Sequence, residues 1–403
     1  MLSPDAPAAL TRLSFRTLLA ALLALMALAL PARADKASQP IPADTLAKMA
    51  AKGTHAAAPI LLRAYKRESE IELWKRNGAG RYVPIKTYPI CRWSGQLGPK
   101  TRTGDRQVPE GFYTVAKSQM NPNSRYYLSF DIGYPNAYDR AHGATGSAIM
   151  VHGICSSMGC FAMTDQVAGE LFAVAREAFA GGQGAFQFQA FPFRMTAANM
   201  ARHRTDPNMP FWRQLKEGSD RFEATGEEPV VGVTAGRYAF APSKDPAKEA
   251  AAQALHRDEN ARIAEIVEEG AAAVRTTYSD GGQHAFWAHR IRQGFPVGDV
   301  SRPEALAYAG QEVVLIAARR KPAPPAAMPE SLWAAVIGPG TPFYPVRAAY
   351  RAPFEGGPTP LFASTARRYE ETLPRLLRAA LDDGLAPPAF ADPQPVVERV
   401  AQR

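Results

Sequence analysis

The sequence predicts a mainly β core with peripheral helices, an α+β fold. Three observations support this prediction. Short runs of mixed apolar and charged residues, separated by turn signals, extend from residue 57 to about residue 132. Apolar residues at helical spacing follow Thr164, and the β pattern returns at Ala185–Phe193. With 403 residues, 46% of them hydrophobic, the chain is long enough for one substantial core and a second, smaller unit.

The first 34 residues have the pattern of a secretory signal peptide. Arg12 and Arg16 precede the apolar run Leu18–Leu30, which is shorter than the roughly 20 residues that cross a bilayer. Pro31–Ala34 has the small residues of a cleavage site. No other stretch has the length and apolarity of a span, so we expect no transmembrane segment in the mature protein. It would be exported to the periplasm of a Gram-negative bacterium; an uncleaved anchor is the alternative.

The charge and the cysteine content indicate the surroundings of the protein and the state of its thiols. The 47 Lys and Arg residues exceed the 38 Asp and Glu residues, and the formal net charge of +9 favours anionic surroundings. No nucleic-acid-binding motif is recognisable, so we expect no nucleic acid partner. The three cysteines are Cys91, Cys155 and Cys160. In an oxidising compartment this odd count leaves one thiol free.

Turn signals and apolar patterns predict the order of the elements. Asn77–Gly80 has the composition of a hairpin turn. The predicted strands are Ile60–Arg67, Glu70–Arg76, Arg81–Cys91, Pro109–Val115, Tyr126–Ile132, Ala148–Val151, Ala185–Phe193 and Pro229–Phe240. The predicted helices are Thr164–Gly181, Phe211–Glu223, Asp245–Tyr278 and Thr365–Leu381.

These elements divide the part of the chain after the signal peptide. A polar, alanine-rich linker at 35–56 precedes a domain at 57–241. A mostly helical extension at 242–320 and a Pro/Arg-rich tail at 321–403, with one helix, follow it. The last two parts show no recognisable chemistry. We expect them to form a cell-envelope contact surface or a partly disordered extension.

One short segment combines residues typical of a catalytic site. His152 ends an apolar run, and Cys160 lies eight positions later, before the helix expected from Thr164. Backbone N–H groups and a helix N-terminus favour negative charge, which predicts a lowered Cys160 pKa and donors for an oxyanion. Gly153 and Gly159 allow tight turns on either side. The segment therefore predicts a thiol nucleophile with His152 as its base.

The same residues permit other interpretations. Cys160 could be a buried structural thiol beside an ordinary histidine. His142, His152, Cys155 and Cys160 could bind zinc, although they lack the paired spacing of common zinc modules. A disulfide could join Cys155 to Cys91 or to Cys160, and the second pairing would block the nucleophile.

The segment resembles the signature of the L,D-transpeptidase (YkuD-type) catalytic domain, and in particular its YafK-like murein transpeptidase branch. The resemblance starts from His152-Gly153 and Ser157-Met158-Gly159-Cys160. It covers about residues 57–241 through further motifs: Ile90–Gly95, Leu97–Lys100, Gly104–Asp105, Pro109–Gly111, Tyr134–Asn136, Asp139–Arg140, Thr145–Gly146, Phe193–Thr196 and Phe211–Trp212. It implies an L,D-transpeptidase-type β-sandwich.

The resemblance also implies a role for each residue of the segment. Cys160 would be the nucleophile, His152 the general base, and the backbone amides of Met158, Gly159 and Cys160 the oxyanion donors. The substrate would be a peptidoglycan tetrapeptide stem, attacked between meso-diaminopimelate and D-alanine. A thioester would form, and an amine would resolve it into a cross-link. No metal or organic cofactor would be required.

Two positions depart from the wider family. Met158 stands where the family usually has a second histidine, and Ala162 where it has an arginine that could bind a substrate carboxylate. Other residues must then contact the substrate, and the candidates are Ser157, Arg140, Tyr138, His142 and Arg194.

Three functions remain open at this point. The first is a periplasmic L,D-transpeptidase that acts on peptidoglycan stem peptides. The second uses the same acyl-enzyme chemistry but ends in hydrolysis, releasing a stem peptide or an outer-membrane lipoprotein from peptidoglycan. The third is a non-catalytic envelope-binding protein that uses its basic surface and long tail.

Overall fold

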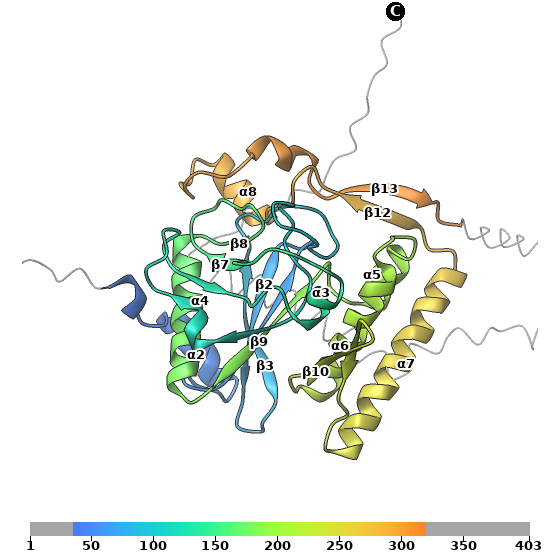
Figure 1. Cartoon of the computed structure of the whole chain (residues 1–403), viewed down its shortest axis with the longest axis horizontal. Helices are drawn as coiled ribbons and strands as arrows, with labels where there is room; N and C mark the ends of the chain where they lie inside the picture. The colour runs from blue at the N-terminus through green and yellow to red at the C-terminus, as the bar shows by residue number, and fades with distance from the viewer. Residues whose placement is uncertain (1–34, 320–403) are drawn as a thin grey trace, which may run out of the picture. The chain divides into compact units, whose positions relative to one another are not determined.

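The computed structural model describes residues 35–319, and Figure 1 shows how their elements are arranged. These residues belong to one of two compact units of the chain. The predicted signal peptide at 1–34 and the predicted tail at 321–403, with its helix Thr365–Leu381, lie outside the described residues.

A five-stranded sheet forms the centre of the fold. It consists of β1 (Ile60–Tyr65), β2 (Glu70–Arg76), β3 (Tyr82–Pro89), β4 (Gly111–Ala116) and β9 (Ala185–Phe191). The order is β3-β2-β1-β9-β4, with β1 and β9 parallel and the other neighbours antiparallel. Asn77 makes the predicted β2–β3 turn, because its side-chain oxygen accepts from the amides of Ala79 and Arg81.

A second sheet of four short strands packs on the first. It consists, in order, of β5 (Met120–Asn121), β6 (Ser129–Asp131), β7 (Met150–His152) and β8 (Phe161–Ala162). Phe130 on β6 packs against Phe186 on β9, and Phe161 on β8 against Phe188, with ring centroids 5.8 and 5.2 Å apart. These contacts join the two sheets through one hydrophobic core. The predicted α+β fold with a β-sandwich core is confirmed.

Helices flank the sheets on two sides (Figure 1). One side carries α2 (Ala43–Ala51) and α4 (Asp165–Ala180), and the other carries α5 (Ala197–Arg202), α6 (Met209–Thr225) and α7 (Pro246–Glu268). Thr164 is the N-cap residue of α4 as predicted, although its side chain makes no capping hydrogen bond. Shorter elements are η1 (Lys36–Ser38), η2 (Lys117–Gln119) and α3 (Ala137–Ala141).

The predicted linker at 35–56 is wrong for the part that forms α2. Met49 of this helix is fully buried in the core. Thr45 donates a 2.5 Å hydrogen bond to Glu170 of α4, and the Tyr88 hydroxyl of β3 donates to the same carboxylate at 2.7 Å. The segment is alanine-rich but amphipathic, so it docks onto the sheet instead of remaining free.

The predicted strand Pro229–Phe240 is a hairpin of two strands, β10 (Val231–Thr234) and β11 (Arg237–Phe240). The chain reverses between these strands because Ala235 and Gly236 both adopt positive φ. The predicted helix Asp245–Tyr278 is also too long: α7 ends at Glu268, and Gly270, with a φ of 85°, leads into a strand.

The remaining elements of the extension are β12 (Ala273–Thr277), α8 (Ala285–Arg292), η3 (Pro303–Tyr308) and β13 (Gln311–Ile316). Strands β12 and β13 pair as an antiparallel ribbon. Within residues 35–319, no helix has the length and apolarity needed to cross a bilayer.

Candidate active site

His152 ends β7, and Cys160 directly precedes β8, the strand that pairs with β7. The two strands are parallel, and His152 lies opposite Ala162. Cys160 lies two residues before Ala162 and outside β8, and its sulfur contacts the backbone of Met150, two residues before His152. Residues 153–160, which join the strands, are called the β7–β8 loop below.

The His152 ring is held in one tautomer. Its Nδ1 atom lies against the carbonyl oxygen of Gly153, which can only accept, so Nδ1 carries the proton and Nε2 keeps a free lone pair. The ring also packs on Tyr126, with centroids 4.8 Å apart. Burial lowers the pKa of His152, and the hydrogen bond to Gly153 opposes this effect only in part. A neutral imidazole with a free Nε2 can accept a proton.

The Cys160 thiol is half-buried beside β7. Its sulfur accepts a hydrogen bond from the Met150 amide at 3.4 Å and lies 3.8 Å from the carbonyl oxygen of Ala148. Burial raises the pKa of Cys160, so the lowered pKa expected from the sequence is wrong. The physical reason is that β8 separates Cys160 from α4, which begins only at Asp165, and a helix dipole acts mainly within its first turn.

The structure distinguishes between the possible cysteine pairings. Cys91 and Cys155 form a disulfide with Cα atoms 5.3 Å apart, and Cys160 is free. All three cysteines of the chain lie within the described residues, so Cys160 carries the only free thiol. The zinc set proposed from the sequence is not assembled, because Cys155 is oxidised and His142 stacks on Tyr138. No other metal-binding group of His, Cys, Asp or Glu occurs in the described part of the chain.

The amides expected to form an oxyanion hole share a serine hydroxyl. The N–H groups of Gly159 and Cys160 donate to Ser157 Oγ at 3.3 and 3.1 Å, both longer than the typical value of about 2.9 Å. The Met158 amide donates no hydrogen bond within residues 35–319, and its side chain is 70% exposed. Gly159 has a φ of 122°, a conformation that side-chain-bearing residues rarely adopt.

Ser157 supports the β7–β8 loop from inside. It is 1% exposed, its hydroxyl donates to the Cys160 carbonyl oxygen at 2.7 Å, and it lies 3.0 Å from Ser94 Oγ. Since the residue is almost fully buried, its side chain offers almost no surface to a substrate, and its predicted contact with substrate stays a prediction. Its contacts instead shape the backbone that carries Cys160.

Arg194 is committed to other partners. Its guanidinium donates to Glu72 at 2.6 Å, pairs with Glu70, and lies over the ring of Tyr65. These contacts hold it on strands β1 and β2. Arg194 is thus already paired with two carboxylates, and its contact with a substrate carboxylate stays a prediction.

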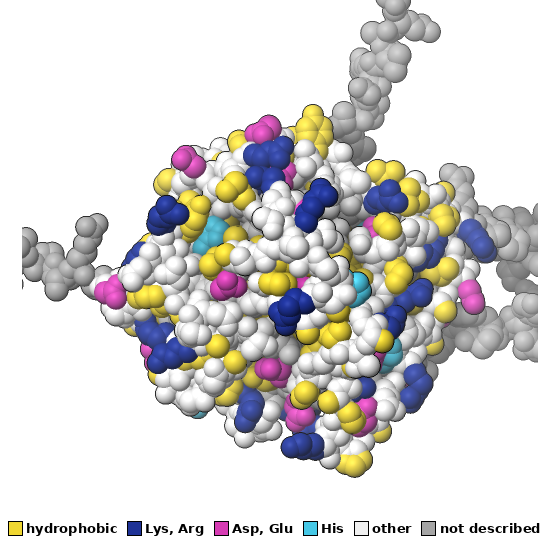
Figure 2. All heavy atoms as spheres, viewed as in Figure 1, with side chains coloured by type: hydrophobic (Ala, Val, Ile, Leu, Met, Phe, Trp, Pro, Cys, Tyr) yellow, Lys and Arg dark blue, Asp and Glu magenta, His cyan; other side chains and the backbone are white. Residues whose placement is uncertain are grey.

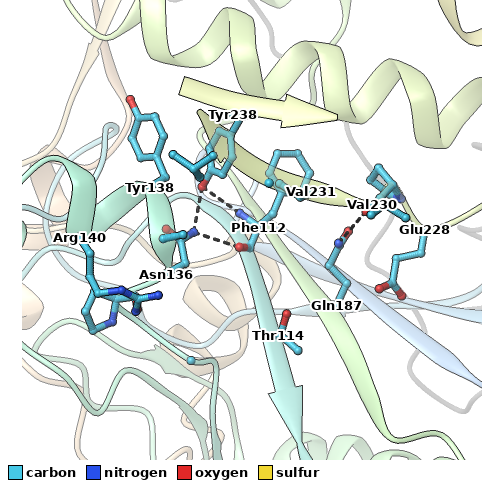
Figure 3. A pocket seen from close by; sticks show the side chains of 16 residues that line it. Phe112, Thr114, Asn136, Tyr138, Arg140, Gln187, Glu228, Val230, Val231 and Tyr238 are labelled. Carbon is cyan, nitrogen blue, oxygen red and sulfur yellow. Dashed lines mark hydrogen bonds between the residues drawn. The ribbon is translucent and has the colours of Figure 1, made fainter. Parts of the chain in front are cut away.

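Arg140 and Tyr138 line a separate cavity of about 450 Å³ between α3 and the β10–β11 hairpin (Figure 3). Tyr138 is largely buried and stacks on Tyr238, with centroids 4.6 Å apart. Neither Cys160 nor His152 lines this cavity. The structure thus places Cys160 beside the strand that ends at His152, and it places Arg140 and Tyr138 at a different cavity.

Sequence reasoning missed a polar cluster that reaches the β7–β8 loop from the extension. Asp280 and Ser301 belong to this cluster, together with Arg92 and Arg106. The only local signal was the turn Ser279–Gly282, which the sequence presents as the end of a helix. Nothing in the spacing indicates that this turn contacts residues more than 100 positions earlier.

Lys and Arg side chains do not form a single patch on the face of the molecule in Figure 2. Figure 2 shows Lys and Arg side chains distributed over that face, with Asp and Glu side chains between them. The formal charge of +9 is therefore not gathered there into one patch that would suit a polyanion.

Comparisons with known proteins match the same region. A family model described as the L,D-transpeptidase catalytic domain (YkuD) matches residues 63–180. The YafK proteins of Escherichia coli K12 and O157:H7 are each 47% identical to this chain over 181 residues. Both are named as L,D-transpeptidases whose activity is unproven. Each alignment covers 45% of this chain and 73% of the relative.

Two solved structures show more distant similarity. The helical cell shape determining protein Pgp2 from Campylobacter jejuni is 13% identical, with a TM-score of 0.27; 58% of this chain and 80% of that chain are covered. Bd1075 from Bdellovibrio bacteriovorus is 14% identical, with a TM-score of 0.24 and coverage of 55% and 76%. The sequence relatives, and not these structures, define the family.

Proposed function

Because this chain belongs to the L,D-transpeptidase family, we propose that it is a periplasmic peptidoglycan L,D-transpeptidase that forms a thioester on Cys160. One observation supports the proposal above all others. The free thiol of Cys160 contacts the backbone of Met150, on the strand that ends at His152, and the His152 imidazole has a free Nε2. A nucleophile beside an oriented base is the arrangement that acyl transfer requires.

The proposed first half-reaction begins at a tetrapeptide stem. Cys160 Sγ attacks the carbonyl carbon between meso-diaminopimelate and D-alanine, and the thiol proton passes to Nε2 of His152. The C–N bond then breaks, His152 returns the proton to the departing amine, and D-alanine leaves. The backbone amides of Met158, Gly159 and Cys160 are the proposed donors to the oxyanion, and the amides of Gly159 and Cys160 would then share their protons with Ser157 Oγ.

The directions of the two pKa shifts indicate how the thiol is activated. Burial raises the pKa of Cys160 and lowers the pKa of His152, so a neutral thiol and a neutral imidazole coexist at rest. A preformed thiolate–imidazolium pair would need shifts in the opposite directions. We therefore expect proton transfer to accompany attack, as general-base catalysis.

This assignment predicts the pH dependence of turnover. The pKa of His152 lies below its ordinary value of about 6.5, so activity should be complete above that pH and be lost as the pH falls through the lowered pKa. His152→Gln should reduce kcat by about 10²- to 10⁴-fold and remove the acidic limb of kcat/KM measured between about pH 4 and 8. The exposed His55→Gln is the control and should keep the wild-type profile. An acidic limb that persists in His152→Gln would contradict the assignment.

The second half-reaction separates the proposal from its alternatives. An acceptor amine that resolves the thioester gives a cross-link, whereas water gives hydrolysis and would release a stem peptide or a lipoprotein. Purified protein incubated with muropeptide tetrapeptides, followed by mass spectrometry of the products, distinguishes these outcomes. Cross-linked or D-amino-acid-exchanged products support the proposal, hydrolysed products alone support the hydrolytic relative, and unchanged substrate supports a binding protein.

Location in the periplasm is part of the proposal. The buried Cys91–Cys155 disulfide suits an oxidising compartment, and the family acts on peptidoglycan, which lies outside the cytoplasmic membrane. The signal peptide expected at 1–34 would provide export. Fractionation of the source cell, with intact-mass analysis of the N-terminus, tests both points.

A further inference from the structure

We propose that the C-terminal extension completes the active site, with Ser301 and Asp280 as positioning residues for the β7–β8 loop. The inference rests on the proposed function of Cys160. It assigns a task to a segment in which the sequence shows no chemistry and which lies outside the matched family region.

Ser301 forms hydrogen bonds with both backbone groups of Ser157, its amide and its carbonyl. The Ser157 amide donates to Ser301 Oγ at 2.9 Å, and the Ser301 hydroxyl donates to the Ser157 carbonyl oxygen at 3.2 Å. The Ser301 carbonyl in turn accepts from Arg92 Nε at 2.9 Å. Since Arg92 is fully buried, this contact fixes Ser301 against the body of the protein.

Ser157 passes this constraint to the reacting group. Its hydroxyl accepts from the amides of Gly159 and Cys160 and donates to the Cys160 carbonyl oxygen. Ser301 is therefore connected, through Ser157 alone, to the backbone that carries the nucleophile and the proposed oxyanion donors. A displacement of about 1 Å in such groups can cost about 100-fold in rate.

Asp280 anchors the same loop through an arginine. This carboxylate is 3% exposed and pairs with Arg106 at 2.6 Å, Arg302 at 3.3 Å and Arg92 at 3.4 Å. Arg106 also donates to the Ser157 carbonyl oxygen at 3.2 Å. Burial alone would raise the pKa of Asp280, but the hydrogen bond from Arg106 and the nearby positive charges keep it below its ordinary value.

The extension also covers the disulfide at the start of the loop. Gln283 donates to the Cys91 carbonyl oxygen at 2.9 Å, and Trp287 packs on the disulfide while its Nε1 donates to the Pro89 carbonyl oxygen at 2.8 Å. The β7–β8 loop is thus held at Cys155 by a covalent bond and at Ser157 by the extension.

The test compares Ser301→Ala and Asp280→Asn with matched controls from the same segment. Ser279→Ala and Asp299→Asn alter exposed side chains with no hydrogen bond or ion pair in the described structure. Three quantities are measured on the full chain: kcat and KM with muropeptide tetrapeptides, the rate of Cys160 alkylation by iodoacetamide at pH 7, and Tm. Alkylation needs no peptidoglycan substrate, so it tests the loop even if the proposed function fails.

We expect Ser301→Ala to lower kcat by about 10-fold or more with KM within about twofold. Alkylation should become several-fold faster, because a loosened loop exposes the half-buried thiol. Ser301→Thr keeps the hydroxyl and should restore both values, and the controls should match wild type. Opposite changes in turnover and alkylation cannot arise from a loss of active protein. Unchanged kcat and alkylation in a folded Ser301→Ala would overturn the inference. If wild type shows no turnover, unchanged alkylation alone would do so.

Discussion

Cys160→Ala should abolish conversion of muropeptide tetrapeptides, with a loss of about 10⁴-fold or more. The thiol supplies the only nucleophile in the proposed reaction, and its neighbours can orient a substrate but cannot form the thioester. The half-buried side chain loses one sulfur atom, so the fold should remain intact. Product analysis by mass spectrometry, with Tm as the measure of folding, checks this expectation.

A thiol count adds an internal control to this experiment. Under denaturing, non-reducing conditions, wild type should react with one equivalent of a thiol reagent and Cys160→Ala with none, because the other two cysteines are bonded to each other. Turnover that survives in a Cys160→Ala preparation without a free thiol would exclude both the transpeptidase and the hydrolase. Catalysis would then have to come from a group other than Cys160, whereas a wild type without turnover is the result that supports the binding protein.

Removal of the disulfide should have the largest effect on stability. The bond joins residues 64 positions apart, and the chain-entropy model assigns a loop of this length about 4 kcal/mol of the unfolding free energy. The double variant Cys91→Ser/Cys155→Ser should lose about this amount in denaturant titrations. It should also lose turnover under native conditions, because Cys155 anchors the start of the β7–β8 loop.

The double variant is preferred because a single Cys91→Ser would free Cys155 to pair with Cys160. Cys160→Ser is the matched control and should retain the wild-type unfolding free energy. An unfolding free energy within about 1 kcal/mol of wild type in the double variant would show that the disulfide contributes little. The packing of the loop would then have to come from the extension alone.

Elements with a strong local pattern could be predicted from the sequence. The helix after Thr164 and the strand Ala185–Phe191 both have periodic apolar residues that need only one buried face to be recognised. The α2 helix could not be predicted in this way, because an alanine-rich stretch has little apolar contrast and its docking depends on Met49 finding the core. The β10–β11 turn was missed because Ala235 is not a typical residue for positive φ.

The candidate site shows the same division. The sequence by itself determined which residues could react: it contains a Cys/His pair in a family-like segment, and it limits the thiols to three. Only the tertiary structure decided that Cys91 pairs with Cys155, that Cys160 is buried enough for its pKa to rise, and that His152 keeps Nε2 free. The tautomer depends on the local turn that presents the Gly153 carbonyl, whereas disulfide pairing and desolvation depend on neighbours distant in the chain. For the same reason Asp280 and Ser301, more than 100 residues after Cys160, could be connected to the site only through the fold.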